Sequence, residues 1–150
     1  MLFLSTFTNK IDKKGRVSVP SQYRNVLRTE QFNGIVAYSS FINECVEACG
    51  MSRVEKLSET IDQLDPYSEE RDAFATTILG GSFQLPLDAD GRIILPAEMI
   101  EVAKLQDRAL FIGKGATFEI WEPENFKEYF SKAKEVAKSE RAKLKFNREI

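Results

Sequence analysis

The sequence contains the pattern Asp-x-x-Gly-Arg twice, at Asp12–Arg16 and at Asp88–Arg92, 76 positions apart. An arginine guanidinium can donate two parallel hydrogen bonds to a phosphate group or to the major-groove edge of a guanine. The aspartate and the glycine suit a tight turn, because the carboxylate accepts a hydrogen bond from a nearby backbone N–H and glycine adopts a positive φ. We therefore predict that the arginines bind nucleic acid and that four residues build the turns: Asp12, Gly15, Asp88 and Gly91.

The residues after the first turn predict which way its arginine points. Arg16 has the parity of Ser18 and the opposite parity to Val17 and Val19, whose apolar side chains should face the core. A single copy of the motif is explained more simply by a solvated arginine paired with Asp12, but two copies offer a two-fold set of contacts. The predicted DNA-binding residues are Arg16, Lys13, Lys14, Lys10, Arg92 and Arg24.

Charge is unevenly distributed along the 150-residue chain, whose formal net charge is −2. Residues 1–30 carry six basic and two acidic residues, a net +4, whereas residues 40–75 carry three basic and nine acidic residues, a net −6. The second copy of the motif is less basic, because Asp90 and Ile100 stand where the first copy has Lys14 and Arg24. We therefore expect the first copy to make the stronger phosphate and base contacts, with Arg92 a secondary contact or a structural residue.

Few residues suit other chemistry. The sequence has no histidine, and its two cysteines, Cys45 and Cys49, would lie roughly 13 Å apart on one strand, too far for a disulfide. We therefore predict buried free thiols, no metal site and no cofactor. No serine lies in a nucleophile-elbow sequence, and turn formation explains the paired acids Asp88 and Asp90. These features predict no enzyme activity and no small-molecule substrate.

The cellular location is predicted from two further features. The first five residues lack the basic region and the full hydrophobic segment of a signal peptide. No apolar run approaches the length needed to span a bilayer. We expect a cytoplasmic, nucleoid-associated protein with no membrane partner.

Each copy of the motif opens a longer unit with the same order of elements. Alternating segments flank the turn and end at Pro20 or Pro96, and a short helix, an apolar strand and an alternating strand follow. These elements are predicted over residues 21–28, 35–38 and 46–49 in the first unit and over 97–104, 109–112 and 118–121 in the second. Apolar residues at helical spacing predict helices from Val54 to Leu64, around Phe74 and from Pro123 onward.

The repeat predicts the domain organisation. We expect one pseudo-symmetric domain over residues 1–150, of mixed α+β class and mainly β, in which two similar units share one core. Unit one covers about 1–79 and unit two about 80–130, followed by a basic C-terminal helix or tail over about 131–150.

The segments Asp12-Lys-Lys-Gly-Arg-Val-Ser-Val-Pro20, Asp88-Ala-Asp-Gly-Arg-Ile-Ile-Leu-Pro96 and Phe118-Glu-Ile-Trp-Glu-Pro123 resemble the MraZ family, over about Phe3 to Phe130. The resemblance implies a transcriptional regulator that binds short direct repeats in duplex DNA upstream of its own gene, in the bacterial division and cell-wall cluster. It also implies two tandem swapped-hairpin units, as in AbrB-like regulators, that form a β-barrel with peripheral helices. The subunits would form a ring-shaped homo-oligomer whose tips face DNA, with Arg16 as prime contact and Arg92 as its counterpart.

The main alternative is a non-enzymatic protein-interaction module built on the same barrel, with an incidental basic tip. Salt distinguishes the two hypotheses. Binding through several phosphates weakens steeply with ionic strength, whereas an apolar protein interface does not.

Overall fold

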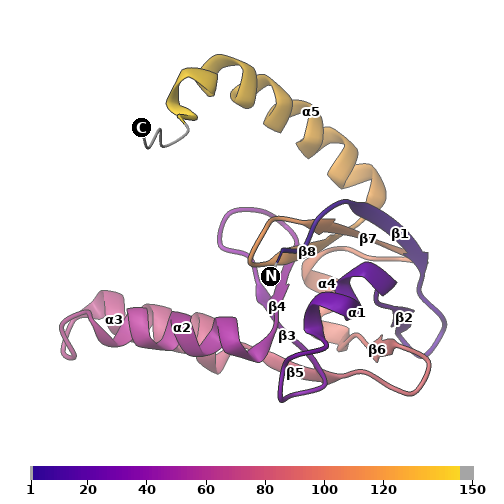
Figure 1. Cartoon of the computed structure of the whole chain (residues 1–150), viewed down its shortest axis with the longest axis horizontal. Coiled ribbons are helices and arrows are strands. Elements are labelled where there is room, and N and C mark those ends of the chain that lie inside the picture. Colours follow the sequence, from indigo (N-terminus) through magenta and orange to yellow (C-terminus); the bar gives the residue numbers. More distant parts are fainter. Residues whose placement is uncertain (1, 146–150) are drawn as a thin grey trace, which may run out of the picture.

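The computed structural model describes residues 2–145, and the last five residues of the predicted basic tail lie outside the described residues (Figure 1). The elements of unit one are β1 (Thr6–Lys10), β2 (Arg16–Ser18), α1 (Ser21–Leu27), β3 (Gly34–Ser39) and β4 (Val46–Cys49). Their counterparts in unit two are β5 (Phe83–Pro86), β6 (Arg92–Ile94), α4 (Ala97–Val102), β7 (Arg108–Gly113) and β8 (Phe118–Trp121). The mixed α and β class and the repeated order of elements are confirmed.

The strands form a six-stranded antiparallel sheet in the order β1-β7-β8-β4-β3-β5 and a two-stranded antiparallel sheet of β2 and β6. No closed barrel is found among residues 2–145, because β1 and β5 are the two edges of the large sheet. The strands β2 and β6 have three residues each and pair with one another. Within the described residues, the ladder between β1 and β2 is reduced to the isolated bridge between Ile11 and Val17. The short strands therefore leave the large sheet open.

The two units exchange strands. The first strand of each unit pairs with the third strand of the other, β1 with β7 and β5 with β3. Strands at equivalent positions pair with each other, β2 with β6 and β4 with β8. In the register of β2 and β6, Val17 lies opposite Ile93, its own repeat counterpart, so an approximate two-fold axis passes between these residues. The main sheet is therefore assembled from both units.

The main core lies between the large sheet, the two-stranded sheet and the short helices α1 and α4. Val17 and Val19 are 1% and 0% exposed, which confirms the predicted alternation along β2. Tyr23 of α1 is fully buried, contacts the rings of Phe3 and Phe118, and donates its hydroxyl hydrogen to the Ser5 carbonyl at 2.7 Å. Buried aromatic rings of this size contribute strongly to stability, because each removes a large apolar area from water.

A helical arm projects from one side of the body (Figure 1). It consists of α2 (Met51–Asp62), α3 (Glu69–Phe74) and the π-helix η1 (Ala75–Gly80). A cluster of buried side chains joins the arm to the sheet and includes Tyr38, Cys49, Ile61 and Ile78. The arm agrees with the predicted helices, whereas the π-helical turns were not predicted.

The helix α5 (Pro123–Glu140) begins at the predicted proline and is followed by the short 3-10 helix η2 (Arg141–Lys143). Glu122 caps it by accepting a hydrogen bond from the Asn125 N–H at 2.8 Å. Phe126 and Trp121 anchor its first turns in a small cluster, and its far end extends away from the body (Figure 1). No helix within residues 2–145 is both long enough and apolar enough to cross a membrane.

Candidate nucleic-acid interface

The first motif folds into a turn closed by its aspartate. Asp12 accepts hydrogen bonds at Oδ1 from the backbone N–H groups of Lys14 and Arg16, both at 2.9 Å. Gly15 has φ +81°, a conformation that an L side chain rarely adopts. A Cβ atom at Gly15 would also lie 3.0 Å from the backbone oxygen of Leu95, so both the backbone angle and the space favour glycine.

The second motif repeats this turn. Asp88 accepts at Oδ1 from the N–H groups of Asp90 and Arg92, at 2.8 and 2.9 Å. Gly91 has φ +76°. Because two different loops adopt the same hydrogen bonding, the shared residues account for the geometry.

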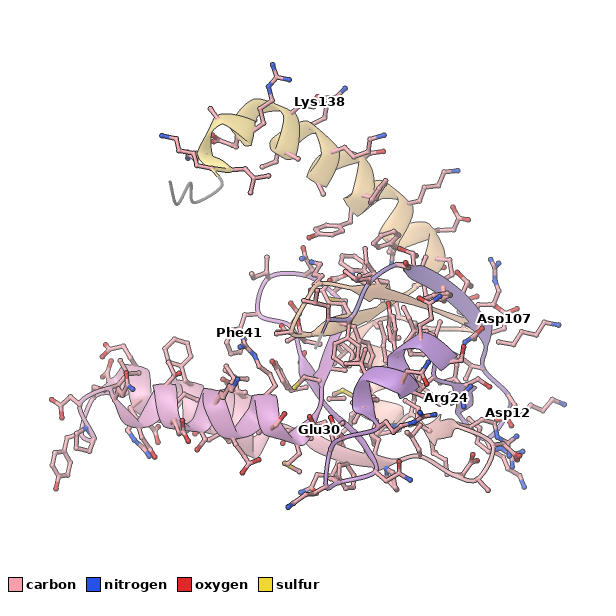
Figure 2. All side chains as sticks on the ribbon, viewed as in Figure 1. Asp12, Arg24, Glu30, Phe41, Asp107 and Lys138 are labelled. Carbon is pink, nitrogen blue, oxygen red and sulfur yellow. The ribbon has the colours of Figure 1, made fainter. Side chains whose placement is uncertain are left out.

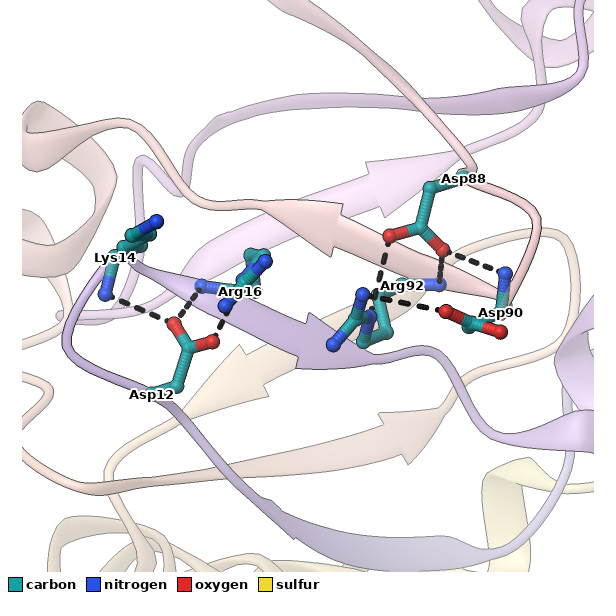
Figure 3. A network of polar contacts seen from close by, with 6 residues as sticks. All are labelled: Asp12, Lys14, Arg16, Asp88, Asp90 and Arg92. Carbon is teal, nitrogen blue, oxygen red and sulfur yellow. Dashed lines mark hydrogen bonds and ion pairs between the residues drawn. The ribbon is translucent and has the colours of Figure 1, made fainter.

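Each aspartate also orients its arginine. Arg16 donates from Nε to Oδ2 of Asp12 at 2.7 Å, and Arg92 donates from Nε to Oδ2 of Asp88 at 3.2 Å (Figure 3). Both arginine side chains are about one third exposed. Pairing through Nε does not use the end-on pair of N–H groups on the two terminal amino groups, which can serve as a fork for a second acceptor.

The charge on these aspartates is favoured by the same contacts. The pKa of Asp12 is lowered from 3.8, mainly by the hydrogen bond from the Arg16 backbone N–H, although desolvation opposes the shift. The pKa of Asp88 is lowered in the same way by the Arg92 backbone. The turns are therefore formed around ionised carboxylates at neutral pH.

The pairing of β2 with β6 brings the two motifs together. Arg16 lies opposite Ile94 and Ser18 lies opposite Arg92, while the intervening pair, Val17 and Ile93, is buried. Directly opposite residues of an antiparallel pair project from the same face. Arg16 and Arg92 therefore share the outer face of the two-stranded sheet, one toward each end (Figure 3).

The two arginines differ in their second contacts. A terminal amino group of Arg92 donates to Asp90 Oδ2 at 3.3 Å. The equivalent position in unit one is Lys14, which has no carboxylate to offer. Within the described residues, the hydrogen bonds of Arg16 involve its Nε and its backbone groups. An acceptor from outside the chain therefore competes with Asp90 at Arg92 but with no equivalent acid at Arg16.

Arg24 lies at the second turn, although its position in the sequence groups it with the first. Its Nε donates to the Val19 carbonyl at 3.0 Å, and a Cβ atom at Gly91 would lie 2.7 Å from its Nη1. Arg24 and Arg28 line a pocket together with Asp88 and Gly91. The repeat counterpart of Arg24, Ile100, lies over Gly15, with its Cδ1 3.8 Å from a Cβ placed there. The sequence predicts a second turn that is less basic than the first, and Arg24 and Arg28 of unit one bring positive charge to it.

The three predicted lysines lie around the first turn. Lys13 and Lys14 are exposed within it, and Lys10 is exposed at the end of β1. Lys10 lies directly opposite Arg108 of β7, an arginine that the sequence analysis missed. Two cations facing each other across strands repel, so this pair favours an anion nearby. Figure 2 shows Asp12 and Arg24 at the end of the molecule opposite the helical arm.

Two further residues of this surface were missed. Arg28 was overlooked because its proximity to the second turn depends on how the units pack. Ile94 is 61% exposed on the outer face, and the parity rule applied to Arg16 and Ser18 could have found it.

Other candidate chemistry is not assembled in the part of the chain that the structure describes. No group of three metal-binding side chains occurs within residues 2–145. Cys45 and Cys49 are buried free thiols, as predicted. Burial raises the pKa of each thiol to about 12, so neither forms a reactive thiolate readily at neutral pH.

The fold and the site define a duplicated, strand-exchanging α/β protein with two aspartate-held arginines on one small sheet. The sequence model of a family described as "MraZ protein, putative antitoxin-like" matches residues 78–148. A protein of Rickettsia bellii (strain OSU 85-389) is 55% identical over 145 residues, covering 96% of this chain and 97% of the relative. Proteins of Rickettsia canadensis (strain McKiel) and Rickettsia akari (strain Hartford) are each 51% identical over 144 residues, with the same coverage. All three are named transcriptional regulator MraZ. The chain belongs to the MraZ family.

Proposed function

We propose that this protein is a sequence-specific DNA-binding transcriptional regulator. Its targets are short repeats upstream of a division and cell-wall gene cluster, in its own promoter. The proposal draws on family membership and on the names of the Rickettsia relatives. These names also favour a non-enzymatic role for this chain. A role in transcription would place the protein at the nucleoid in the cytoplasm.

The observation that carries the proposal is the placement of Arg16 and Arg92 on one outward face of a two-stranded antiparallel sheet. The major groove of B-DNA admits a two-stranded ribbon, and its guanine edge accepts two hydrogen bonds from an arginine. Each arginine is held by an aspartate through Nε, so less side-chain freedom is lost on binding. Arg16 is the main base contact. Arg92 has to break its hydrogen bond to Asp90 before its terminal amino group can contact DNA.

Basic side chains around the sheet suit the phosphate backbone on either side of such a groove. Lys10, Lys13 and Lys14 flank the first turn, with Arg108 opposite Lys10. Arg24 lies at the second turn. Phosphate contacts fix the position of a protein on the duplex and supply most of its salt-dependent affinity.

We also propose that the protein acts as a ring-shaped homo-oligomer of swapped-hairpin units. The exchange of β1 and β5 between units supports the swapped-hairpin description. Exposed apolar side chains at the base of the arm suit contact with a second copy, since Ile42 is 88% exposed and Phe41 packs only against Phe74 among the described aromatic rings. An oligomer spanning several repeats gains affinity through effective concentration. Ile42→Glu should reduce the mass measured by light scattering.

The decisive experiment is a fluorescence-anisotropy titration against duplex from upstream of the gene and against a scrambled duplex, at two salt concentrations. We expect the wild type to prefer the upstream duplex in a salt-sensitive manner, and Arg16→Ala to lose the preference. Arg71→Ala is the matched control, because Arg71 is also about one third exposed and paired with an aspartate, Asp62, but lies on the helical arm.

The same titration tests the alternative of a protein-interaction module. Equal binding of both duplexes, or binding that is unaffected by Arg16→Ala, would favour that alternative. The turn arginines would then be structural residues of the aspartate turns.

A further inference from the structure

We propose that Ile94 is a specificity-determining residue that contacts the C5-methyl group of a thymine beside the base read by Arg16. The inference rests on the proposed DNA-binding function and extends it to a residue with no charge and no hydrogen-bonding group. Its basis is an isoleucine that is exposed on the face that carries Arg16 and Arg92.

The exposure of Ile94 is unusual for its position. Its neighbours Ile93 and Leu95 are 1% and 2% exposed, whereas Ile94 is 61% exposed on a strand that is paired and held in place. Polar residues commonly occupy the outer face of such a strand. Ile94 therefore presents an apolar side chain outward in a fixed direction.

The register places Ile94 beside the prime arginine. Ile94 lies directly opposite Arg16, and residues so placed have Cβ atoms about 5 Å apart. Neighbouring base pairs are about 3.4 Å apart along a DNA strand. A base contact made by Arg16 therefore brings Ile94 within reach of an adjacent base pair.

The chemistry of the groove identifies the group that Ile94 would meet. The thymine methyl is the apolar group that distinguishes base edges in the major groove, and the other distinguishing groups are hydrogen-bond donors and acceptors. An isoleucine facing a donor or an acceptor would bury it without a partner, which is unfavourable. Ile94 thus favours thymine and disfavours the other bases at its position.

The repeat provides an internal comparison. The counterpart of Ile94 is Ser18, which lies opposite Arg92 on the same face. One half of the surface therefore pairs an arginine with an apolar side chain and the other pairs an arginine with a hydroxyl group. A single subunit should therefore have different base preferences beside Arg16 and beside Arg92, although equivalent strands of the two units pair about an approximate two-fold axis.

The test compares duplexes amplified from the upstream region with dTTP or with dUTP, which removes every thymine methyl. We expect the wild type to bind the uracil duplex about threefold to fourfold more weakly for each methyl contacted. Ile94→Ser should bind both duplexes equally, and Ile94→Val should retain part of the difference. Ser18→Ile should increase the sensitivity to methyl removal.

Each outcome separates this inference from the function on which it rests. Equal binding of the upstream and scrambled duplexes by the wild type would overturn both the DNA-binding function and the thymine contact. Preference for the upstream duplex with no effect of uracil, or an equal effect of uracil on wild type and Ile94→Ser, would overturn the thymine contact alone. A change in oligomeric mass for Ile94→Ser would also overturn it, because Ile94 would then lie in a subunit interface.

Discussion

Arg24 of the first repeat lies over Gly91 of the second, with its Nη1 2.7 Å from the position that a Cβ atom at Gly91 would occupy. Gly91 therefore has two roles, because it provides the positive φ of the turn and leaves room for the guanidinium. The relationship also joins the two repeats at the predicted DNA surface. Each arginine-bearing turn is covered by a helix of the other unit, α1 over the second turn and α4 over the first.

Arg24→Ile should weaken DNA binding without unfolding the protein. The substitution reproduces the residue at the equivalent position of unit two, Ile100, which already packs over a turn glycine. The loss of one phosphate contact should lower the slope of log affinity against log salt by about 0.9 for each contact. Anisotropy titrations over a salt series measure this slope.

The reverse substitution, Ile100→Arg, provides the control for Arg24→Ile. It should place a cation over Gly15 and raise both affinity and salt dependence. Unchanged slopes in both variants would show that these positions do not contact phosphates.

Much of the local structure could be predicted from the sequence. The turns at Gly15 and Gly91 and the burial of Val17 follow from residue types and from the alternation of side chains along a strand. The start of α5 follows from Pro123. These features depend on a few consecutive residues, whose conformational preferences act locally.

The arrangement around the predicted site could not be derived in the same way. Pairing of β1 with β7 brings Arg108 opposite Lys10, and packing of α1 over the second turn brings Arg24 to Gly91. Both contacts depend on how two similar units exchange strands, and the hydrophobic pattern is compatible with pairing inside one unit as well. The closed barrel implied by the resemblance is not found, because β2 pairs with β6 and the β1–β2 ladder among the described residues is the single bridge between Ile11 and Val17.

Gly15→Ala and Gly91→Ala should differ in their effects. Both substitutions place an L side chain at positive φ, which costs on the order of 1–2 kcal/mol. At Gly15 the added Cβ meets the backbone oxygen of Leu95 at 3.0 Å, whereas at Gly91 it meets the end of the Arg24 side chain, which can move. We expect the larger loss of thermal stability for Gly15→Ala.

DNA binding provides the second measurement for these variants. Gly91→Ala should displace Arg24 and lower the salt slope as Arg24→Ile does. Identical melting temperatures and identical salt slopes for the two alanine variants would contradict this account of the turns.

Lys114→Met should destabilise the hairpin of β7 and β8 and its contact with α5, because Lys114 Nζ also donates to the Tyr129 hydroxyl of α5 at 3.1 Å. Lys114 Nζ lies 3.0 Å from Oε1 of Glu119, a carboxylate that is 6% exposed and also accepts from Nε1 of Trp121 at 2.8 Å. Removal of the cation leaves Glu119 buried without its ion-pair partner, at a cost of about 1–3 kcal/mol. Urea unfolding at fixed protein concentration, followed by the fluorescence of Trp121, the single tryptophan, measures the loss.

An exposed ion pair on α5 provides the control for Lys114→Met. Lys132 is 3.7 Å from Glu128, and both side chains are about three quarters exposed. Lys132→Met should change stability by less than about 0.5 kcal/mol. The double variant Lys114→Met with Glu119→Gln should recover part of the loss, because the amide carries no charge. An equal effect of Lys114→Met and Lys132→Met would contradict a role for burial.

Acid should destabilise the protein in part through the two turn aspartates. The pKa values of Asp12 and Asp88 in the folded protein are lowered from 3.8, so the unfolded chain binds protons more readily at these groups. Their contribution to stability is therefore present above about pH 4 and is lost as the pH falls through the lowered values. The double variant Asp12→Asn with Asp88→Asn should be less stable than the wild type at pH 6, and its free energy of unfolding should decline less steeply between about pH 4 and pH 2.

Asp62→Asn, which removes the ion pair of Arg71 on the arm, is the control and should leave this decline close to that of the wild type. A decline as steep in the double variant as in the wild type would show that other carboxylates dominate the acid response.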